Sequence, residues 1–170
     1  MLLDVGAEYA NYNADLTRSI PVNGKFTKRQ KDVYNAELRV QREAYKMLRP
    51  GNIIPEYQKE VSRIMESELL GLGLISKTDI KNQDPDNPAY KKYFMHGVSH
   101  HLGLDVHDVA SIYRKMETGM VFTVEPGIYI REENLGIRIE NNVVITEKGI
   151  DDLMKSIPVD ADEIEDLMNH

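Results

Sequence analysis

The sequence predicts an α+β fold whose sheet is largely antiparallel. Three observations support this: β-like segments precede two helical segments, further β-like segments follow them, and there is no βαβαβ alternation. The chain has 170 residues, of which 41% are hydrophobic. A chain of this length and composition is expected to form one domain with a substantial core.

The N-terminal segment predicts two neighbouring strands. Residues 1–9 and 14–22 are β-like, and a polar Asn-Tyr-Asn turn at 11–13 lies between them. The chain opens directly on a strand, so nothing upstream covers this edge of the sheet. Since exposed edges invite pairing, we expect that a partner segment is missing there.

Two helices are expected next. The first begins at Thr27, which forms a T-x-x-Q capping box with Gln30, and it ends before the Pro-Gly pair at 50–51. The second runs from about Pro55 to Leu72, because its apolar residues recur at helical spacing on one face.

The second half of the chain predicts mainly strands. Residues 76–92 are polar and contain prolines, which favours a surface loop. Strands are expected near 98–107, 120–130 and 136–146, and a short acidic helix at 160–168. There is no internal repeat or linker, so the prediction is a single domain over residues 1–170.

Charge and composition exclude several classes of function. The net charge of −7 disfavours nucleic acid as a partner, because nucleic acid binding requires clustered Lys and Arg. No stretch approaches the roughly 20 apolar residues of a membrane span, and the start of the chain has no signal-peptide core. The absence of cysteine excludes disulfides and thiolate metal sites and fits a cytoplasmic location.

Two aspartates occur in the predicted N-terminal strands. Asp4 and Asp15 lie on neighbouring strands, so a hairpin could bring their carboxylates together. The alternative is that Asp4 opens a turn with Gly6 and that Asp15 is a surface residue. Because aspartate disfavours strands, two aspartates in apolar strands favour a functional role.

Four of the five histidines lie within residues 96–108. On a strand, His96 and His100 would share one face, and His101 would point to the other face and be exposed. Aspartates in the same run could orient the imidazole rings. So dense a cluster disfavours the alternative that these are ordinary structural histidines.

Two glutamates occupy β-like segments. Glu125 ends an apolar run just before Pro-Gly, a place that can aim a side chain into a cleft. Glu140 alternates with isoleucines and shares a face with Arg138. For this strand alone, a solvent-exposed pair of Arg138 and Glu140 is the simpler interpretation. Together with the other motifs, a role as metal ligand is favoured.

The five residues of these motifs suit two divalent metal ions. Four carboxylates would balance the four positive charges of two ions, and burying either set alone would be costly. An oxygen-rich set with one imidazole favours Mn²⁺, Co²⁺ or Fe²⁺ over a structural zinc, although a catalytic Zn²⁺ remains compatible. The set consists of Asp4, Asp15, His100, Glu125 and Glu140.

The motifs in this order resemble the catalytic domain of the Xaa-Pro aminopeptidases, which have the pita-bread fold. The matching segments are the Asp4 and Asp15 pair, H-G-V-S-H-H-L-G-L-D-V-H-D at 96–108, T-V-E-P-G-I-Y at 123–129 and G-I-R-I-E-N at 136–141. The resemblance covers nearly the whole chain. It implies a metal-dependent aminopeptidase that cleaves the bond between an N-terminal residue and a following proline.

The resemblance also implies roles for individual residues. Asp4 would bind one metal ion, His100 and Glu125 the other, and Asp15 and Glu140 would bridge the two. Two ions, most simply Mn²⁺, would supply an activated water.

Catalytic roles would fall to Glu125, which would carry a proton to the leaving nitrogen, and to His107, which would contact the scissile carbonyl or stabilise the oxyanion. His96 would support catalysis and, with Tyr129 and Arg138, line the pocket for the substrate proline.

The resemblance implies that this chain is the second half of a pita-bread domain, with the ligand-bearing hairpin of the first. The rest of the first half and an N-terminal domain would lie upstream. We therefore expect weak or no activity from the chain alone, and self-association or pairing with the missing half-domain. The expected partner is a peptide with proline in second position. The alternatives are prolidase, which cleaves only dipeptides, and a non-catalytic pita-bread scaffold.

Overall fold

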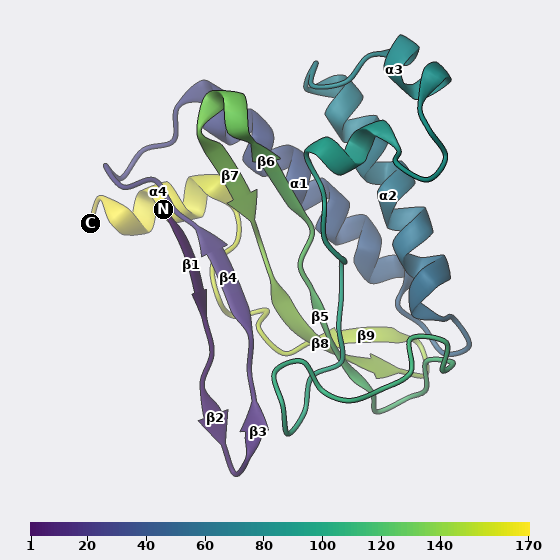
Figure 1. The fold of residues 1–170 in the computed structure, drawn as a ribbon. Coiled ribbons are helices and arrows are strands. Elements are labelled where there is room, and N and C mark those ends of the chain that lie inside the picture. The colour runs from purple at the N-terminus through teal and green to yellow at the C-terminus, as the bar shows by residue number, and fades with distance from the viewer.

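The computed structural model describes all residues from Met1 to His170, and its strands and helices form an α+β arrangement (Figure 1). The strands are β1 (Leu2–Val5), β2 (Glu8–Tyr9), β3 (Tyr12–Asn13), β4 (Leu16–Ser19), β5 (Val121–Val124), β6 (Gly127–Ile130), β7 (Leu135–Arg138), β8 (Asn141–Thr146) and β9 (Gly149–Asp152). The helices are α1 (Lys28–Met47), α2 (Ile54–Gly71), α3 (Lys77–Asn82) and α4 (Ala161–Met168), with short 3₁₀ turns at Ala89–Lys92 and Arg131–Glu133.

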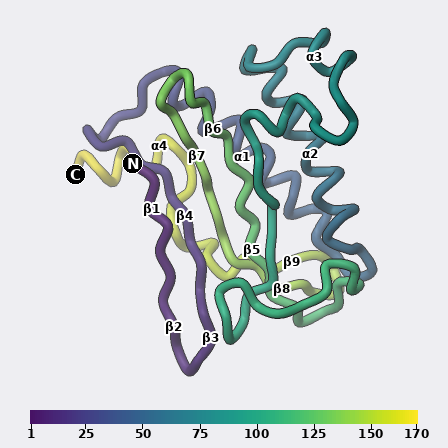
Figure 2. Tube along the Cα trace, in the orientation of Figure 1, coloured from purple at the N-terminus to yellow at the C-terminus, as the bar shows by residue number.

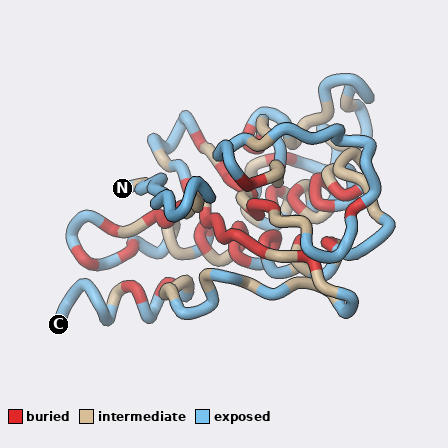
Figure 3. The backbone as a smooth tube through the Cα atoms, turned by 90° about the horizontal axis from the view of Figure 1, so that it is seen from below, coloured by how far each residue is buried: buried red, intermediate tan, exposed pale blue.

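All strand pairs are antiparallel, as predicted. They form four small sheets with the orders β1-β4, β2-β3, β5-β8-β9 and β6-β7. Helix α1 packs against strands of the last two sheets and against α2 (Figures 1 and 2). Both termini lie on the same side of the molecule and are exposed (Figure 3). None of the helices has the length and apolar character that crossing a membrane requires.

Helix α1 begins and packs as its sequence dictates. Thr27 and Gln30 form the predicted capping box, each bonding to the other's backbone N–H. The buried face recurs at helical spacing and joins a core of aliphatic and aromatic side chains. Two polar residues interrupt this face. Ile139 N donates to Glu37 Oε1 at 3.2 Å, and Gln41 Nε2 donates to the carbonyls of Val124 and Ile139. Helix α1 therefore holds the backbone beside both Glu125 and Glu140.

Two predicted segments are wrong. Residues 76–92 are not simply a loop, because Ser76 and Asp79 form a second capping box that begins α3. Residues 98–107 are not a strand. Their first part lies extended beside β5, with Thr123 N donating to the His100 carbonyl, but the chain then turns back and Asp108 N donates to the His101 carbonyl.

The long strands predicted at 120–130 and 136–146 are each interrupted. The first breaks at Glu125 and Pro126, since proline has no N–H for a ladder. The second breaks between β7 and β8, where Glu140 N donates to the Thr17 carbonyl at 3.0 Å instead of continuing a single ladder. Both interruptions fall at a candidate metal ligand.

Glu37 makes a testable contribution to stability. It is fully buried, and burial raises the pKa of its carboxyl well above its ordinary value, while Oε2 has no hydrogen-bond partner. Because the pKa of Glu37 is higher in the folded chain, protonated Glu37 contributes to the free energy of unfolding at low pH. This contribution is lost as the pH rises from about 4.3, the pKa in the unfolded chain, through the pKa in the folded chain. Glu37→Gln does not titrate. We expect it to gain stability relative to the unmodified chain between pH 5 and pH 8, by more than the ~0.5 kcal/mol typical of surface changes.

Urea unfolding at both pH values measures this difference. Glu43→Gln on the same helix is the matched control, because Glu43 is half-exposed and pairs with Lys46. The same free-energy difference for Glu37→Gln at pH 5 and pH 8 would contradict the interpretation.

Candidate metal centre

The N-terminal hairpin brings Asp4 and Asp15 together. Strand β1 pairs with β4 so that Asp4 lies opposite Thr17, and the carboxyl groups of the two aspartates are close enough to interact. Gly6 permits this close approach, because a Cβ there would lie 2.0 Å from the Ala14 carbonyl oxygen. Burial, followed by the interaction with the Asp4 carboxyl, raises the pKa of Asp15.

Glu140 reaches the same place from the opposite strand. Besides the backbone bond to Thr17, the Thr17 hydroxyl donates to Glu140 Oε2 at 2.6 Å. Glu140 is 1% exposed, and its other oxygen, Oε1, is buried without a hydrogen-bond partner. Burial, with a smaller contribution from the charge of Glu125, raises the pKa of Glu140 to about 8. The solvent-exposed interpretation of this glutamate is therefore wrong.

His100 and Glu125 complete the cluster. His100 Nε2 lies 3.5 Å from Asp15 Oδ2 and 3.3 Å from Glu125 Oε1. Its Nδ1 lies 3.0 Å from the His101 carbonyl, which can only accept, so Nδ1 carries a proton. Nε2 faces the two carboxylate oxygens. Burial raises the pKa of Glu125 to about 7.

These residues fit a divalent cation. The ligand atoms of Asp15, His100 and Glu140 all lie within 4.8 Å of one another. Asp4 and Glu125 are outside this group of three, but each contacts one of its members. The centre contains several acceptors, an unpartnered buried oxygen and few donors. A bound cation would satisfy these acceptor atoms, including the unpartnered oxygen, at once.

Arg138 connects this cluster to a second group. Its guanidinium donates to Asp4 Oδ2, to the Thr17 hydroxyl at 3.1 Å and to the Tyr129 hydroxyl at 3.2 Å. The Tyr129 hydroxyl lies 2.8 Å from His96 Nε2, and His96 Nδ1 lies 2.7 Å from the Gly97 carbonyl. Burial lowers the pKa of His96, so its ring is neutral at pH 7. One consistent proton arrangement follows: Arg138 donates to Tyr129, Tyr129 to His96, and His96 to Gly97.

The remaining histidines of the cluster lie differently. His107 is exposed, and its ring centroid lies 4.3 Å from that of His100. His101 was expected to be exposed, but it is half-buried against Phe122 with centroids 4.3 Å apart. The sequence had no means of placing Phe122 beneath it. Only His101 points away from the site.

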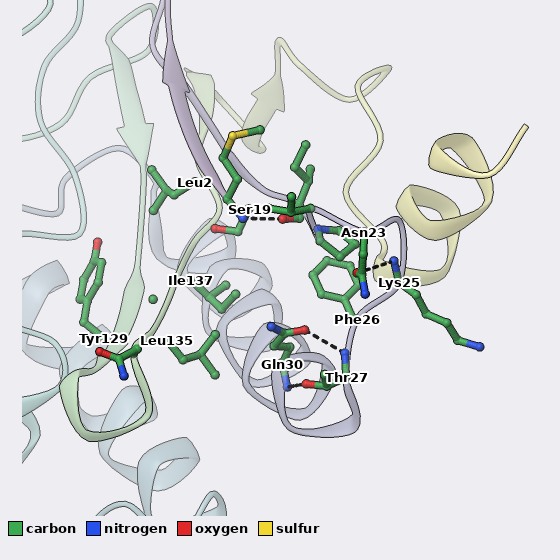
Figure 4. A pocket seen from close by; sticks show the side chains of 16 residues that line it. Leu2, Ser19, Asn23, Lys25, Phe26, Thr27, Gln30, Tyr129, Leu135 and Ile137 are labelled. Carbon is green, nitrogen blue, oxygen red and sulfur yellow. Dashed lines mark hydrogen bonds between the residues drawn. The ribbon is translucent and has the colours of Figure 1, made fainter.

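Three cavities adjoin these groups, and one of about 650 Å³ meets them only at Tyr129. A shallow one of about 290 Å³ is lined by His96, Gly97, Ser99, His100, His107, Glu125 and Arg138. A larger one of about 580 Å³ lies between the start of β1, the loop before α1 and the β6–β7 hairpin (Figure 4). It contains Tyr129 but none of the five candidate ligands. The chemistry therefore belongs to the cavity of about 290 Å³, which His100 and Glu125 line.

Sequence reasoning missed two threonines that orient the carboxylates. Thr17 donates to Glu140, and the Thr123 hydroxyl donates to Glu125 Oε1 at 3.2 Å. Both follow a period of two from a candidate ligand, since Thr17 is two residues after Asp15 and Thr123 two before Glu125. That spacing was a usable signal, because alternate strand residues share a face.

Metal addition should stabilise the folded chain. Mn²⁺ at about 100 times its dissociation constant should add roughly 2.7 kcal/mol to the free energy of unfolding. Asp15→Asn removes a charge from the centre and should abolish most of this gain, whereas Asp86→Asn, in an exposed loop, should keep it. Thermal unfolding with and without Mn²⁺ measures the effect. Equal stabilisation of all three proteins would show that the ion binds elsewhere.

Comparisons with known proteins agree with this centre. A family model described as metallopeptidase family M24 matches residues 1–147. The Xaa-Pro aminopeptidases of Haemophilus influenzae and Escherichia coli are 43% and 45% identical to this chain over 99% of its length. The matches cover 42% and 40% of those relatives, so the chain spans less than half of their length.

Solved structures match as well. Zinc-substituted Escherichia coli aminopeptidase P in complex with product has a TM-score of 0.88 at 43% identity. Proline aminopeptidase P II from Yersinia pestis has a TM-score of 0.89 at 42% identity. Each match covers 99% of this chain, and 40% and 41% respectively of the solved chain. The chain thus has part of the pita-bread fold and belongs to metallopeptidase family M24.

Proposed function

We propose that this chain carries the metal centre of an Xaa-Pro aminopeptidase, which hydrolyses the bond between an N-terminal residue and a following proline. The observation that carries the proposal is the convergence of four carboxylates and His100 beside the group formed by Arg138, Tyr129 and His96. The names of the relatives support the same activity.

Two divalent ions, which we propose to be Mn²⁺, would be held by Asp4, Asp15, His100, Glu125 and Glu140. When bound, they would supply a water of lowered pKa and a positive charge for the transition state. We propose Glu125 as the residue that carries a proton to the leaving nitrogen, because its carboxyl lines the small cavity and lies 3.3 Å from His100 Nε2.

The neighbouring group would recognise the substrate. Tyr129 and His96 are held by hydrogen bonds to each other, and Arg138 fixes Tyr129 from the other side. We propose that these side chains form a wall for the substrate proline, whose tertiary amide has no N–H to satisfy. His107, exposed beside His100, would contact the scissile carbonyl.

Activity of the chain alone is proposed to be slow. The chain spans about 40% of its relatives, so walls of the cleft and any filter on peptide length would come from segments outside it. We propose that the chain pairs with the missing first half of the pita-bread domain or with a second copy of itself. We also propose that it works in the cytoplasm.

Hydrolysis of an Xaa-Pro peptide in the presence of Mn²⁺ tests the proposal. We expect turnover well below the 1–10³ s⁻¹ that is typical of enzymes. The matched Xaa-Ala peptide should be cleaved roughly tenfold more slowly than the Xaa-Pro peptide, and chelation of the metal should abolish activity on both. Glu125→Gln should lower turnover by about 10²-fold or more, whereas Glu117→Gln, exposed and paired with Arg114, should not.

The possible outcomes separate the parts of the proposal. Equal cleavage of both peptides, or cleavage that survives chelation, would contradict the function. Turnover in the typical range would contradict only the slow activity of the isolated chain. If turnover is undetectable, saturable perturbation of the His96 and Tyr129 NMR signals by the Xaa-Pro peptide becomes the readout, and its absence would count against the function.

A further inference from the structure

We infer that Asn142 is a positioning residue that holds the candidate metal ligand Asp15 in place. Its side-chain amide makes two hydrogen bonds to the main chain of Asp15. Asp15 N donates to Asn142 Oδ1 at 3.0 Å, and Asn142 Nδ2 donates to the Asp15 carbonyl at 2.6 Å. Asn142 is 2% exposed, so water does not compete for these bonds. The inference rests on the proposed metal centre.

The sheet explains why a side chain is needed here. The bridge between Thr17 and Glu140 is antiparallel, so continuing it by two residues in each direction places Asp15 opposite Asn142. Strand β8 already has β5 on one edge and β9 on the other, and the Asn142 carbonyl accepts from Leu153 N. The backbone of Asn142 therefore cannot form the backbone hydrogen bonds to Asp15 that would continue this bridge. The side-chain amide of Asn142, with one acceptor and a donor, makes two hydrogen bonds to Asp15 in their place.

Asp15 depends on this contact. It lies just before β4, where the pairing of β1 with β4 ends at Val5 and Leu16. Its main chain makes no hydrogen bond to another backbone group. The two bonds from Asn142 are thus what fixes the Asp15 main chain relative to Glu140, which lies two residues before Asn142 in the chain. Without these bonds the Asp15 main chain would no longer be held in position, although all five candidate ligands would still be present.

Co²⁺ titration of Asn142→Ala tests the inference, with visible absorption of the bound ion as the readout. We expect a dissociation constant roughly 10–100-fold higher than that of the unmodified chain and a changed absorption spectrum, as for other residues that orient metal ligands. Asn52→Ala is the matched control, because its amide donates to the Met47 carbonyl at 2.7 Å at the end of α1, away from the site. It should lower the melting temperature but not the Co²⁺ affinity.

Unchanged affinity and spectrum in a folded Asn142→Ala protein would overturn the inference, even if its melting temperature falls. If that variant does not fold, hydrogen exchange of the Asp15 amide in the unmodified chain decides. Slow exchange supports the two hydrogen bonds between Asn142 and the Asp15 main chain, and fast exchange overturns the inference. If the unmodified chain binds no Co²⁺, the proposed metal centre fails. Hydrogen exchange of the Asp15 amide then still tests whether Asn142 holds the Asp15 main chain.

Discussion

The convergence of four carboxylates on one imidazole is the constraint on which the rest of this structure depends. Two unit charges 4 Å apart repel by about 4 kcal/mol at an effective dielectric constant of 20. The centre places Asp4, Asp15, Glu125 and Glu140 within contact of one another or of His100. Arg138 is the one permanent cation paired with these carboxylates, at Asp4 and Glu140. Burial is the main cause of the raised pKa values of Asp15, Glu125 and Glu140, and the charges of the neighbouring carboxylates add to it.

The fold resists this repulsion through main-chain attachments behind the carboxylates. Residues 15–17 cross residues 140–142 through the Thr17 and Asn142 contacts. Helix α1 holds the next backbone positions through Glu37 and Gln41. Arg18 adds a further attachment, donating to the Glu140 carbonyl and to the carbonyl of Pro158. The carboxylates therefore stay together because the strands that carry them cannot separate without exposing buried polar groups.

Much of this could be predicted from the sequence, because local signals were strong. The capping box at Thr27, the helical spacing of α1 and α2 and the antiparallel pairing were all readable, and so was each candidate ligand, as a charge in an apolar run. What escaped was set by contacts distant in sequence. The extended segment around His100 is not a strand because the chain turns back after His101, and Asn142 looked like an ordinary strand residue until Asp15 was beside it. Ser76 and Asp79 are different, since their capping box was visible but the polarity of the segment favoured a loop.

Anomalous diffraction from crystals grown with Mn²⁺ tests the central claim most directly, because it locates the ions without reference to activity. The account predicts two anomalous peaks enclosed by Asp4, Asp15, His100, Glu125 and Glu140, with one of them adjoining Glu140 Oε1, the oxygen that lacks a partner. Peaks confined to surface carboxylates, or no peak within this group at saturating Mn²⁺, would contradict it.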